Sequence, residues 1–153
     1  MPSKWSPTSN EKSPARESWS VRRLFARRQQ SKDIRVKLSN TTRGTIVGNN
    51  VEVACNSANR RKGLLGRDHL SLGEGLWIIP CESIHTFGMQ FPIDLIYLDR
   101  EQRVKKIRSN VLPWRLSVCL SAHSVIELPG GTVSATGTMP GDLLLSSLEN
   151  KRT

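Results

Sequence analysis

The chain has 153 residues, a length typical of one domain, and its hydrophobic content of 37% is low for a chain that packs along its whole length. No apolar run is long enough for the core of a secretory signal peptide or for a membrane span. We therefore expect a cytoplasmic protein without a transmembrane segment.

Residues 1–33 are the polar, basic part of the chain. They hold few large apolar side chains among many Ser, Pro, Gln, Arg and Lys residues, so they cannot bury enough surface to offset their ordering entropy. We predict a disordered tail. Val21, Leu24, Phe25 and Arg28 have helical spacing, which is compatible with a basic amphipathic helix that forms on an anionic surface and makes the protein membrane-peripheral. The alternatives are a solvated tail without a specific role and, given its Arg and Ser content, a transit peptide.

From residue 34 the apolar residues mostly alternate. Residues 34–38 predict a half-buried strand, and two short strands flanking Gly48-Asn49-Asn50 predict a hairpin over 45–54. Ser57 offers a helix N-cap and Gly66 suits the C-terminal left-handed position, so residues 57–65 predict a helix of two turns.

The middle of the chain predicts further strands over 76–79, 84–87 and 93–98. A turn over 99–102 leads into residues 103–108, whose charge density favours an exposed edge strand that is protected from pairing with another chain. The alternative is a nucleic-acid contact, but no aromatic residue lies among these cations to stack on a base.

The last third is read in the same way. Residues 111–122 are ambiguous between helix and strand, 124–128 predict a strand, 132–136 one helical turn, and 143–146 a final strand. Many short strands and little helix indicate a mainly β (α+β) fold: a compact barrel-like or sandwich domain over 34–153 with one or two short helices.

Asp94 is the most constrained polar residue, because it stands in an apolar strand and a buried carboxylate without partners costs several kcal/mol. If 84–87 and 93–98 pair, Thr86 lies opposite Asp94, and a one-residue bulge brings His85 there instead. The two readings are a polar staple that fixes strand register and the floor of a ligand site. Candidate ligand-binding residues are His85, Thr86, Met89, Asp94, Arg67, Trp114 and Glu127.

No catalytic or metal signature is complete. Ser83 or Cys81 with His85 are separated by about 7 Å or more along one strand, too far for a nucleophile to reach its base. No spacing supports a metal site, and we expect no cofactor. Three cysteines in apolar contexts favour free structural thiols in a reducing compartment.

Several short motifs follow one another along the chain: Arg60–Arg67, Glu74–Trp77, Ile84–Met89 with Pro92–Asp94, Pro113–Arg115, and Val125–Thr132 with Gly141-Asp142. Over about residues 45–146 this succession resembles the domain-of-unknown-function family 192, the uncharacterised ACR family. The resemblance implies a small β-rich domain without an established activity, and residues 1–33 lie outside it.

We therefore predict a non-catalytic accessory module, monomeric or weakly associating, that binds a small ligand or a protein. The alternatives are a hydrolase-like or metal-dependent enzyme that uses the His85 and Asp94 region, and a nucleic-acid or anionic-membrane binder that acts through the basic tail.

Overall fold

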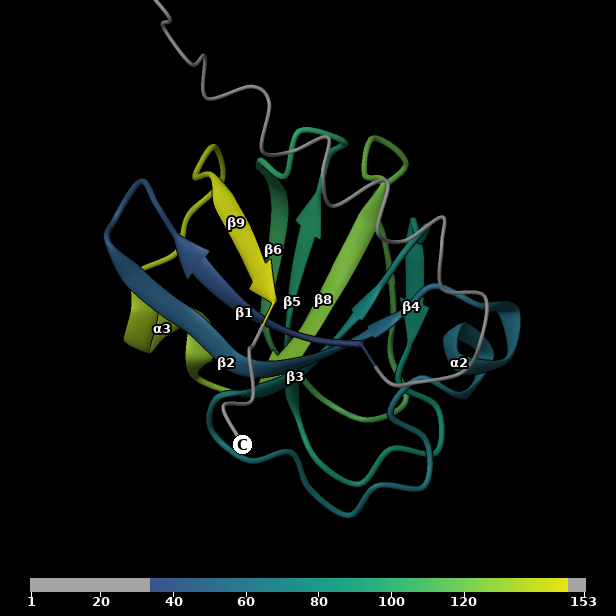
Figure 1. Ribbon diagram of the computed structural model, residues 1–153. Helices are drawn as coiled ribbons and strands as arrows, with labels where there is room; N and C mark the ends of the chain where they lie inside the picture. The colour runs from purple at the N-terminus through teal and green to yellow at the C-terminus, as the bar shows by residue number, and fades with distance from the viewer. Residues whose placement is uncertain (1–33, 149–153) are drawn as a thin grey trace, which may run out of the picture. The chain divides into compact units, whose positions relative to one another are not determined.

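Seven strands form one strongly curled sheet in the computed structural model, which describes residues 34–148 (Figure 1). The predicted tail, residues 1–33, lies outside the described residues. The strands of this sheet are β1 (Ile34–Asn40), β2 (Thr45–Ala54), β3 (Glu74–Ile78), β5 (Ile93–Leu98), β6 (Val104–Val111), β8 (Ser124–Pro129) and β9 (Leu144–Leu148), in the order β6-β5-β8-β3-β2-β1-β9. The prediction of a mainly β, barrel-like fold is confirmed.

The sheet curls far enough for its two edge strands to meet at one end. An isolated bridge joins Arg103 to Leu143, and the N–H of Val104 donates to the carbonyl of Asp142 at 2.9 Å. Asp142 is 3% exposed and accepts hydrogen bonds from Arg43 Nε at 2.6 Å and from Asn40 Nδ2 at 2.9 Å. The Arg43 bond lowers the pKa of Asp142 to about 2, so the carboxylate stays charged and anchors this junction.

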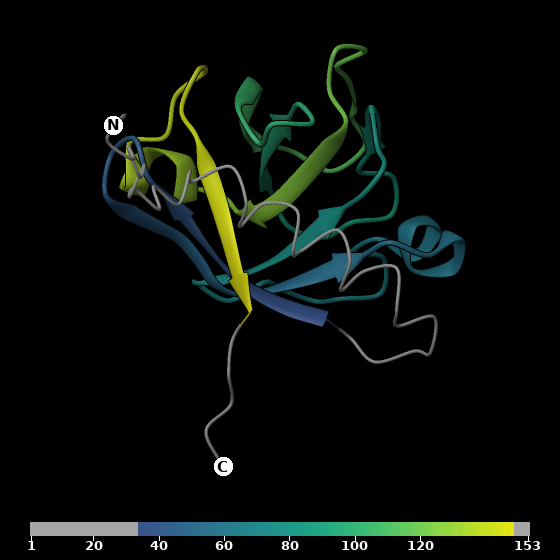
Figure 2. The ribbon, with the colours of Figure 1, turned by 45° about the horizontal axis from the view of Figure 1, so that its top comes forward.

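A second, two-stranded sheet lies outside the curl, together with a short helix. It pairs β4 (Ser83–His85) with β7 (Leu116–Val118), and α2 (Ser57–Lys62) lies beside it, whereas α3 (Thr132–Thr136) lies at the far end of the main sheet (Figures 1 and 2). This arrangement gives the main sheet two covered faces and therefore two cores.

Cross-strand pairs show which residues belong to each core, because paired residues share a face and successive residues alternate. Ile96 pairs with Ile126 on the concave face, and Leu95 pairs with Glu127 on the outer face. The outer-face core holds Leu76, Ile78, Leu95, Tyr97 and Val125 from the main sheet, with Leu64, Leu70 and Ile84 packed against them. Glu127 is thus a carboxyl group in the middle of an apolar layer.

Two predicted pairings are wrong. Residues 45–54 form one continuous strand rather than a hairpin, because they pair with β1 from one end to the other. Two register shifts near Leu38 interrupt this pairing but do not end it. The strand at 84–87 does not pair with β5: it pairs with β7, thirty residues later, while β5 lies between β6 and β8. Thr86 and His85 are therefore not the partners of Asp94.

Other local predictions are confirmed. β6 is an edge strand of the sheet with Lys105 and Arg108 exposed, and residues 132–136 form a helical turn. The helix at 57 is shorter than predicted and is capped by Asn56, whose Oδ1 accepts the N–H of Asn59 at 2.8 Å; it ends at Gly63, which has a φ of 52°.

Candidate functional site

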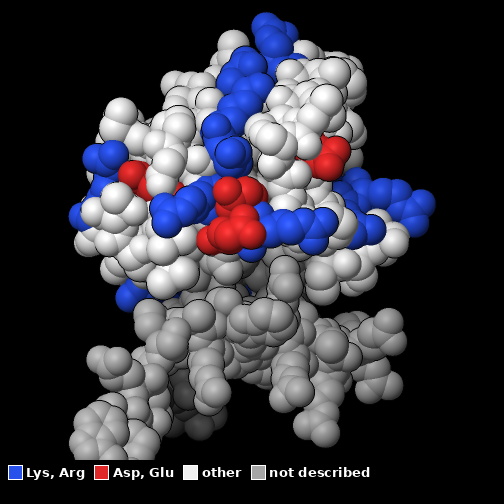
Figure 3. Space-filling model, turned by 90° about the horizontal axis from the view of Figure 1, so that it is seen from above, with Lys and Arg blue, Asp and Glu red and all other residues white. Residues whose placement is uncertain are grey.

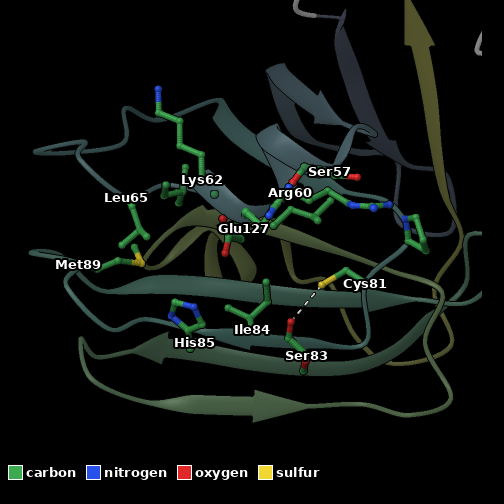
Figure 4. Close-up of a pocket in the computed structure, with 15 residues that line it drawn as sticks. Ser57, Arg60, Lys62, Leu65, Cys81, Ser83, Ile84, His85, Met89 and Glu127 are labelled. Carbon is green, nitrogen blue, oxygen red and sulfur yellow. Dashed lines mark hydrogen bonds between the residues drawn. The ribbon is translucent and has the colours of Figure 1, made fainter. Parts of the chain in front are cut away.

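A pocket of about 460 Å³ lies over the outer face of the main sheet (Figure 4). Its walls come from α2 and the residues after it, from the segment that leads into β4, and from β4 itself; β8 supplies the floor. Among its lining residues are Arg60, Lys62, Leu65, Cys81, Ser83, His85, Met89 and Glu127. The pocket exists because α2 and the β4–β7 sheet cover the same outer face but do not close against each other.

Glu127 is the polar group at the floor of this pocket. It is 3% exposed, its cross-strand neighbours are Leu76 and Leu95, and its Oε2 has no hydrogen-bond partner among the described residues. Burial raises the pKa of Glu127 to about 8, and the positive charge of Arg67 only partly opposes this shift. At neutral pH Glu127 is therefore a carboxylic acid, which carries a proton that it can donate.

The α2 wall is basic. Arg60, Arg61 and Lys62 occupy the last turn of the helix, where cations interact favourably with the helix dipole. Arg60 is held by a bond from its guanidinium to the carbonyl of Ile79 at 3.3 Å, and Arg61 by one to the carbonyl of Ser57 at 3.2 Å, while Lys62 is exposed. The pocket thus combines a neutral acid at its floor with positive charge on one wall.

The β4 wall carries a thiol. Cys81 Sγ lies 3.1 Å from the carbonyl oxygen of Ser83 and donates a hydrogen bond to it (Figure 4). Burial raises the pKa of Cys81, so the group remains a thiol at neutral pH and is a poor nucleophile. Cys81 and Cys119 pack partly buried against the outer-face core and all three cysteines are free, but Cys55 is exposed, contrary to the predicted apolar context.

Asp94 lies on the other face of the sheet, away from the pocket. It is fully buried, as predicted, but its two oxygens accept the backbone N–H groups of Asn110 and Val133, each at 2.8 Å. Asn110 belongs to the irregular part of β6 and has a φ of 54°, and Val133 lies in the first turn of α3, whose N-cap Gly131 offers no side chain. Asp94 therefore satisfies backbone donors that the bulge and the helix start leave open.

The remaining predicted residues divide between the pocket and its surroundings. His85 and Met89 line the pocket with Glu127. Arg67 Nη2 binds Glu52 at 2.8 Å. The structure therefore brings His85, Met89 and Glu127 together and does not bring Asp94 to them.

Thr86 and Trp114 form a separate unit beside the pocket. The buried Thr86 hydroxyl donates to the carbonyl of Leu112 at 2.8 Å and accepts the N–H of Arg115 at 2.9 Å, and the N–H of Trp114 donates to the carbonyl of Thr86 at 3.0 Å. These bonds hold Trp114 at a φ of 64°, which a non-glycine residue rarely adopts. Thr86 acts through the backbone that it fixes.

Sequence reasoning missed Arg61, Lys62, Leu65 and Ser83 as lining residues. The basic run at the end of a short helix was visible in the sequence, but nothing local showed that this helix faces the strand at 83–85. Among the residues that the structure describes, no three His, Cys, Asp or Glu side chains are placed to hold a metal ion. Within residues 34–148, neither helix has the length and hydropathy that a membrane crossing requires.

A curled sheet with an outer-face pocket of this kind defines a small β half-barrel domain. The chain belongs to the domain-of-unknown-function family 192, described as Uncharacterized ACR, whose model matches residues 37–145. It is similar to a UPF0127 protein of Thermococcus sibiricus, with 30% identity over 121 residues that cover 75% of this chain and 77% of the relative. A UPF0127 protein of Thermococcus gammatolerans is 30% identical over 119 residues, 74% of this chain and 76% of the relative.

Two crystal structures share the fold. One is of a protein from Sinorhizobium meliloti described as a "putative transcription regulator", with a TM-score of 0.66, 23% identity, and coverage of 78% of this chain and 97% of that chain. The other is of a protein of unknown function from Novosphingobium aromaticivorans, with a TM-score of 0.64, 25% identity, and coverage of 74% of this chain and 84% of that chain.

Proposed function

We propose that this domain is a non-catalytic binding module that takes a small organic anion into the pocket above Glu127. The observation that carries this proposal is the Oε2 of Glu127, which is buried, has no hydrogen-bond partner among the described residues and lines the pocket. Other buried polar atoms of this kind, such as Tyr97 Oη and Ser117 Oγ, belong to residues that do not line the pocket. Asp94 and Asp142, which are equally buried, have their partners within the protein.

The chemistry of the pocket supports this ligand class. A protonated Glu127 donates to an acceptor such as a carbonyl or carboxylate oxygen, while Arg61 and Lys62 attract negative charge at the wall. Leu65, Ile84 and Met89 supply apolar contacts, and a volume of about 460 Å³ lies in the range of small-molecule sites. We assign Glu127 to the acceptor, Met89 and His85 to the body of the ligand, and Arg67 to the charge balance around Glu127.

Binding rather than catalysis fits the groups that are present. The thiol of Cys81 keeps its proton, and Asp94, the predicted partner of His85, faces the concave core instead. A cytoplasmic, monomeric accessory role, and contact of residues 1–33 with an anionic surface, complete the proposal as expectations from the sequence.

Native mass spectrometry of the purified full-length protein, with metal analysis of the same sample, tests the proposal. We expect a retained small molecule, or else a rise in Tm with one of acetate, succinate or citrate. The same anion should slow alkylation of Cys81 by iodoacetamide while leaving Cys55, which is exposed and outside the pocket lining, unchanged.

Glu127→Leu should abolish both effects, because an apolar side chain of similar length cannot donate to the ligand. Glu82→Gln is the matched control, since Glu82 is exposed and does not line the pocket. Absence of any retained molecule, Tm shift or protection of Cys81 would refute the proposal, and a stoichiometric metal would favour an enzyme.

A further inference from the structure

The outward face of the β4–β7 sheet exposes a group of large apolar side chains. Alternation along β7 buries Ser117 and turns Leu116, which is 62% exposed, and Val118, which is 39% exposed, outward. Trp114, which precedes β7, is 66% exposed. Leu120, in the turn that follows, is 78% exposed, and Phe87, just after β4, is 46% exposed. We call these five residues the apolar face. Such a concentration is uncommon on a soluble protein and marks an interaction surface.

The aromatic part of this face is held rigidly. Phe87 stacks on His85 with ring centroids 5.1 Å apart and on Trp114 with centroids 5.8 Å apart. The bonds of Thr86 fix the backbone of Trp114 at its positive φ, and the indole is exposed there. Strain that persists in this way is maintained by the surrounding structure and is typical of functional positions.

Positive charge borders the apolar face. Lys106 and Arg108 lie opposite Tyr97 and Leu95 in the β5–β6 pairing, which places them on the side of the main sheet that carries β7. Lys106 Nζ donates to the carbonyl of Val118 at 2.7 Å, so Lys106 lies against β7. Arg115, beside Trp114, is exposed as well. Seen from above, basic side chains predominate over acidic ones on the described surface (Figure 3).

We propose that the apolar face docks the domain on an anionic membrane surface. Tryptophan suits the headgroup region because its apolar ring carries a polar N–H group. Phenylalanine, leucine and valine reach the acyl boundary, and bordering cations are attracted by anionic headgroups. The aliphatic members argue against single-stranded nucleic acid, which is bound mainly by stacked aromatic side chains and cations. This proposal does not depend on the pocket having a ligand.

The test uses the full-length protein and two kinds of vesicle, pure phosphatidylcholine and phosphatidylcholine with about 30% phosphatidylserine. We expect co-sedimentation with the anionic vesicles that weakens as salt rises. Leu116→Ser and Leu120→Ser should each lower the partition coefficient about fivefold or more, because each removes apolar area that the membrane would bury. Leu72→Ser is the matched control, since Leu72 is 87% exposed but lies outside the apolar face.

Thermal melts should show that all three variants fold as the parent does, because the replaced side chains are exposed. Equal vesicle binding by Leu116→Ser and Leu72→Ser would overturn the proposal and assign any binding to residues 1–33 or to general charge. Binding of an oligothymidylate that the two face variants abolish would assign the surface to nucleic acid. A concentration-dependent dimer that Leu116→Ser dissociates would assign it to a second copy of the chain. Both outcomes would also overturn the membrane proposal.

Discussion

Asp94 and Glu127 are buried carboxyl groups on neighbouring strands, and they differ in almost everything else. Asp94 pairs with Leu128 and faces the concave core, where two backbone N–H groups approach its oxygens. Glu127 pairs with Leu95 and faces the outer core, where its Oε2 meets no partner. Burial alone therefore does not identify a functional carboxyl group in this fold. The number of hydrogen bonds that the group makes separates a structural residue from a candidate ligand contact.

The largest expected effect comes from breaking the Asp94 side of this comparison. Asp94→Asn keeps the shape but places an NH₂ group against one of two backbone donors, so the free energy of unfolding should fall by about 3 kcal/mol. Urea denaturation measures it. A loss of less than about 0.5 kcal/mol would show that the two hydrogen bonds from Asn110 and Val133 to this carboxylate contribute little to stability.

Glu127 should make the free energy of unfolding depend on pH. Its pKa is near 4.5 in the unfolded chain and about 8 in the folded one, so between these values only the folded state holds the proton. Stability should therefore be complete below pH 4.5 and fall as pH rises toward 8. Relative to Glu127→Gln, which does not titrate, the parent should lose about 2 kcal/mol between pH 5.5 and 7, at about 1.4 kcal/mol per pH unit. Parallel stability curves for parent and variant would contradict the raised pKa.

A smaller effect is expected at Thr86. Thr86→Val removes the hydroxyl that bonds Leu112 and Arg115, which should cost about 1.5 kcal/mol and release the backbone around Trp114. Because Thr86 and Asp94 share no hydrogen-bond partner, the double variant should lose the sum of the two single losses. Denaturation of all three variants measures this, and a clear departure from additivity would restore the original prediction that the two residues interact.

The smallest effect on stability should follow from removing residues 1–33. Their composition offers few core contacts, so Tm should change little, while adsorption to anionic vesicles or to nucleic acid should weaken and become less salt-dependent. Differential scanning calorimetry beside vesicle sedimentation measures both. A drop of several degrees in Tm would show that these residues pack on the domain.

Elements that depend on short-range sequence signals were predicted correctly, whereas pairings between distant strands were missed. The apolar runs of β5 and β8 and the helical turn over 132–136 are short-range signals, and these elements lie where they were expected. Gly48 was taken for a turn residue, whereas it lies within β2 at a position where a Cβ would approach Val51 Cγ2 to 2.6 Å, so the glycine serves close packing.

The candidate site shows the same limit. Glu127, His85 and Met89 were all named as candidate ligand-binding residues from the sequence. Their relation to α2 was not predictable, because β4 pairs with β7 across a long separation and no turn signal encodes that contact. Asp94 was recognised as buried and bonded, but its partners are main-chain groups of β6 and α3, which side-chain patterns do not reveal.

The junction between β6 and β9 joins the two edges of the curled sheet at one end, through only a few bonds. Besides the bond from Val104, it is spanned near one end by the N–H of Gly141 to the carbonyl of Val104 at 2.8 Å and by the N–H of Leu144 to the carbonyl of Gln102 at 3.0 Å. A junction with so few bonds can open locally while the ladder between β5 and β8, which is paired over six residues, stays intact. Amide exchange at Gly141 and Leu144 should thus report local opening of the junction between β6 and β9, while Ile96 and Ile126 exchange only when the whole domain unfolds.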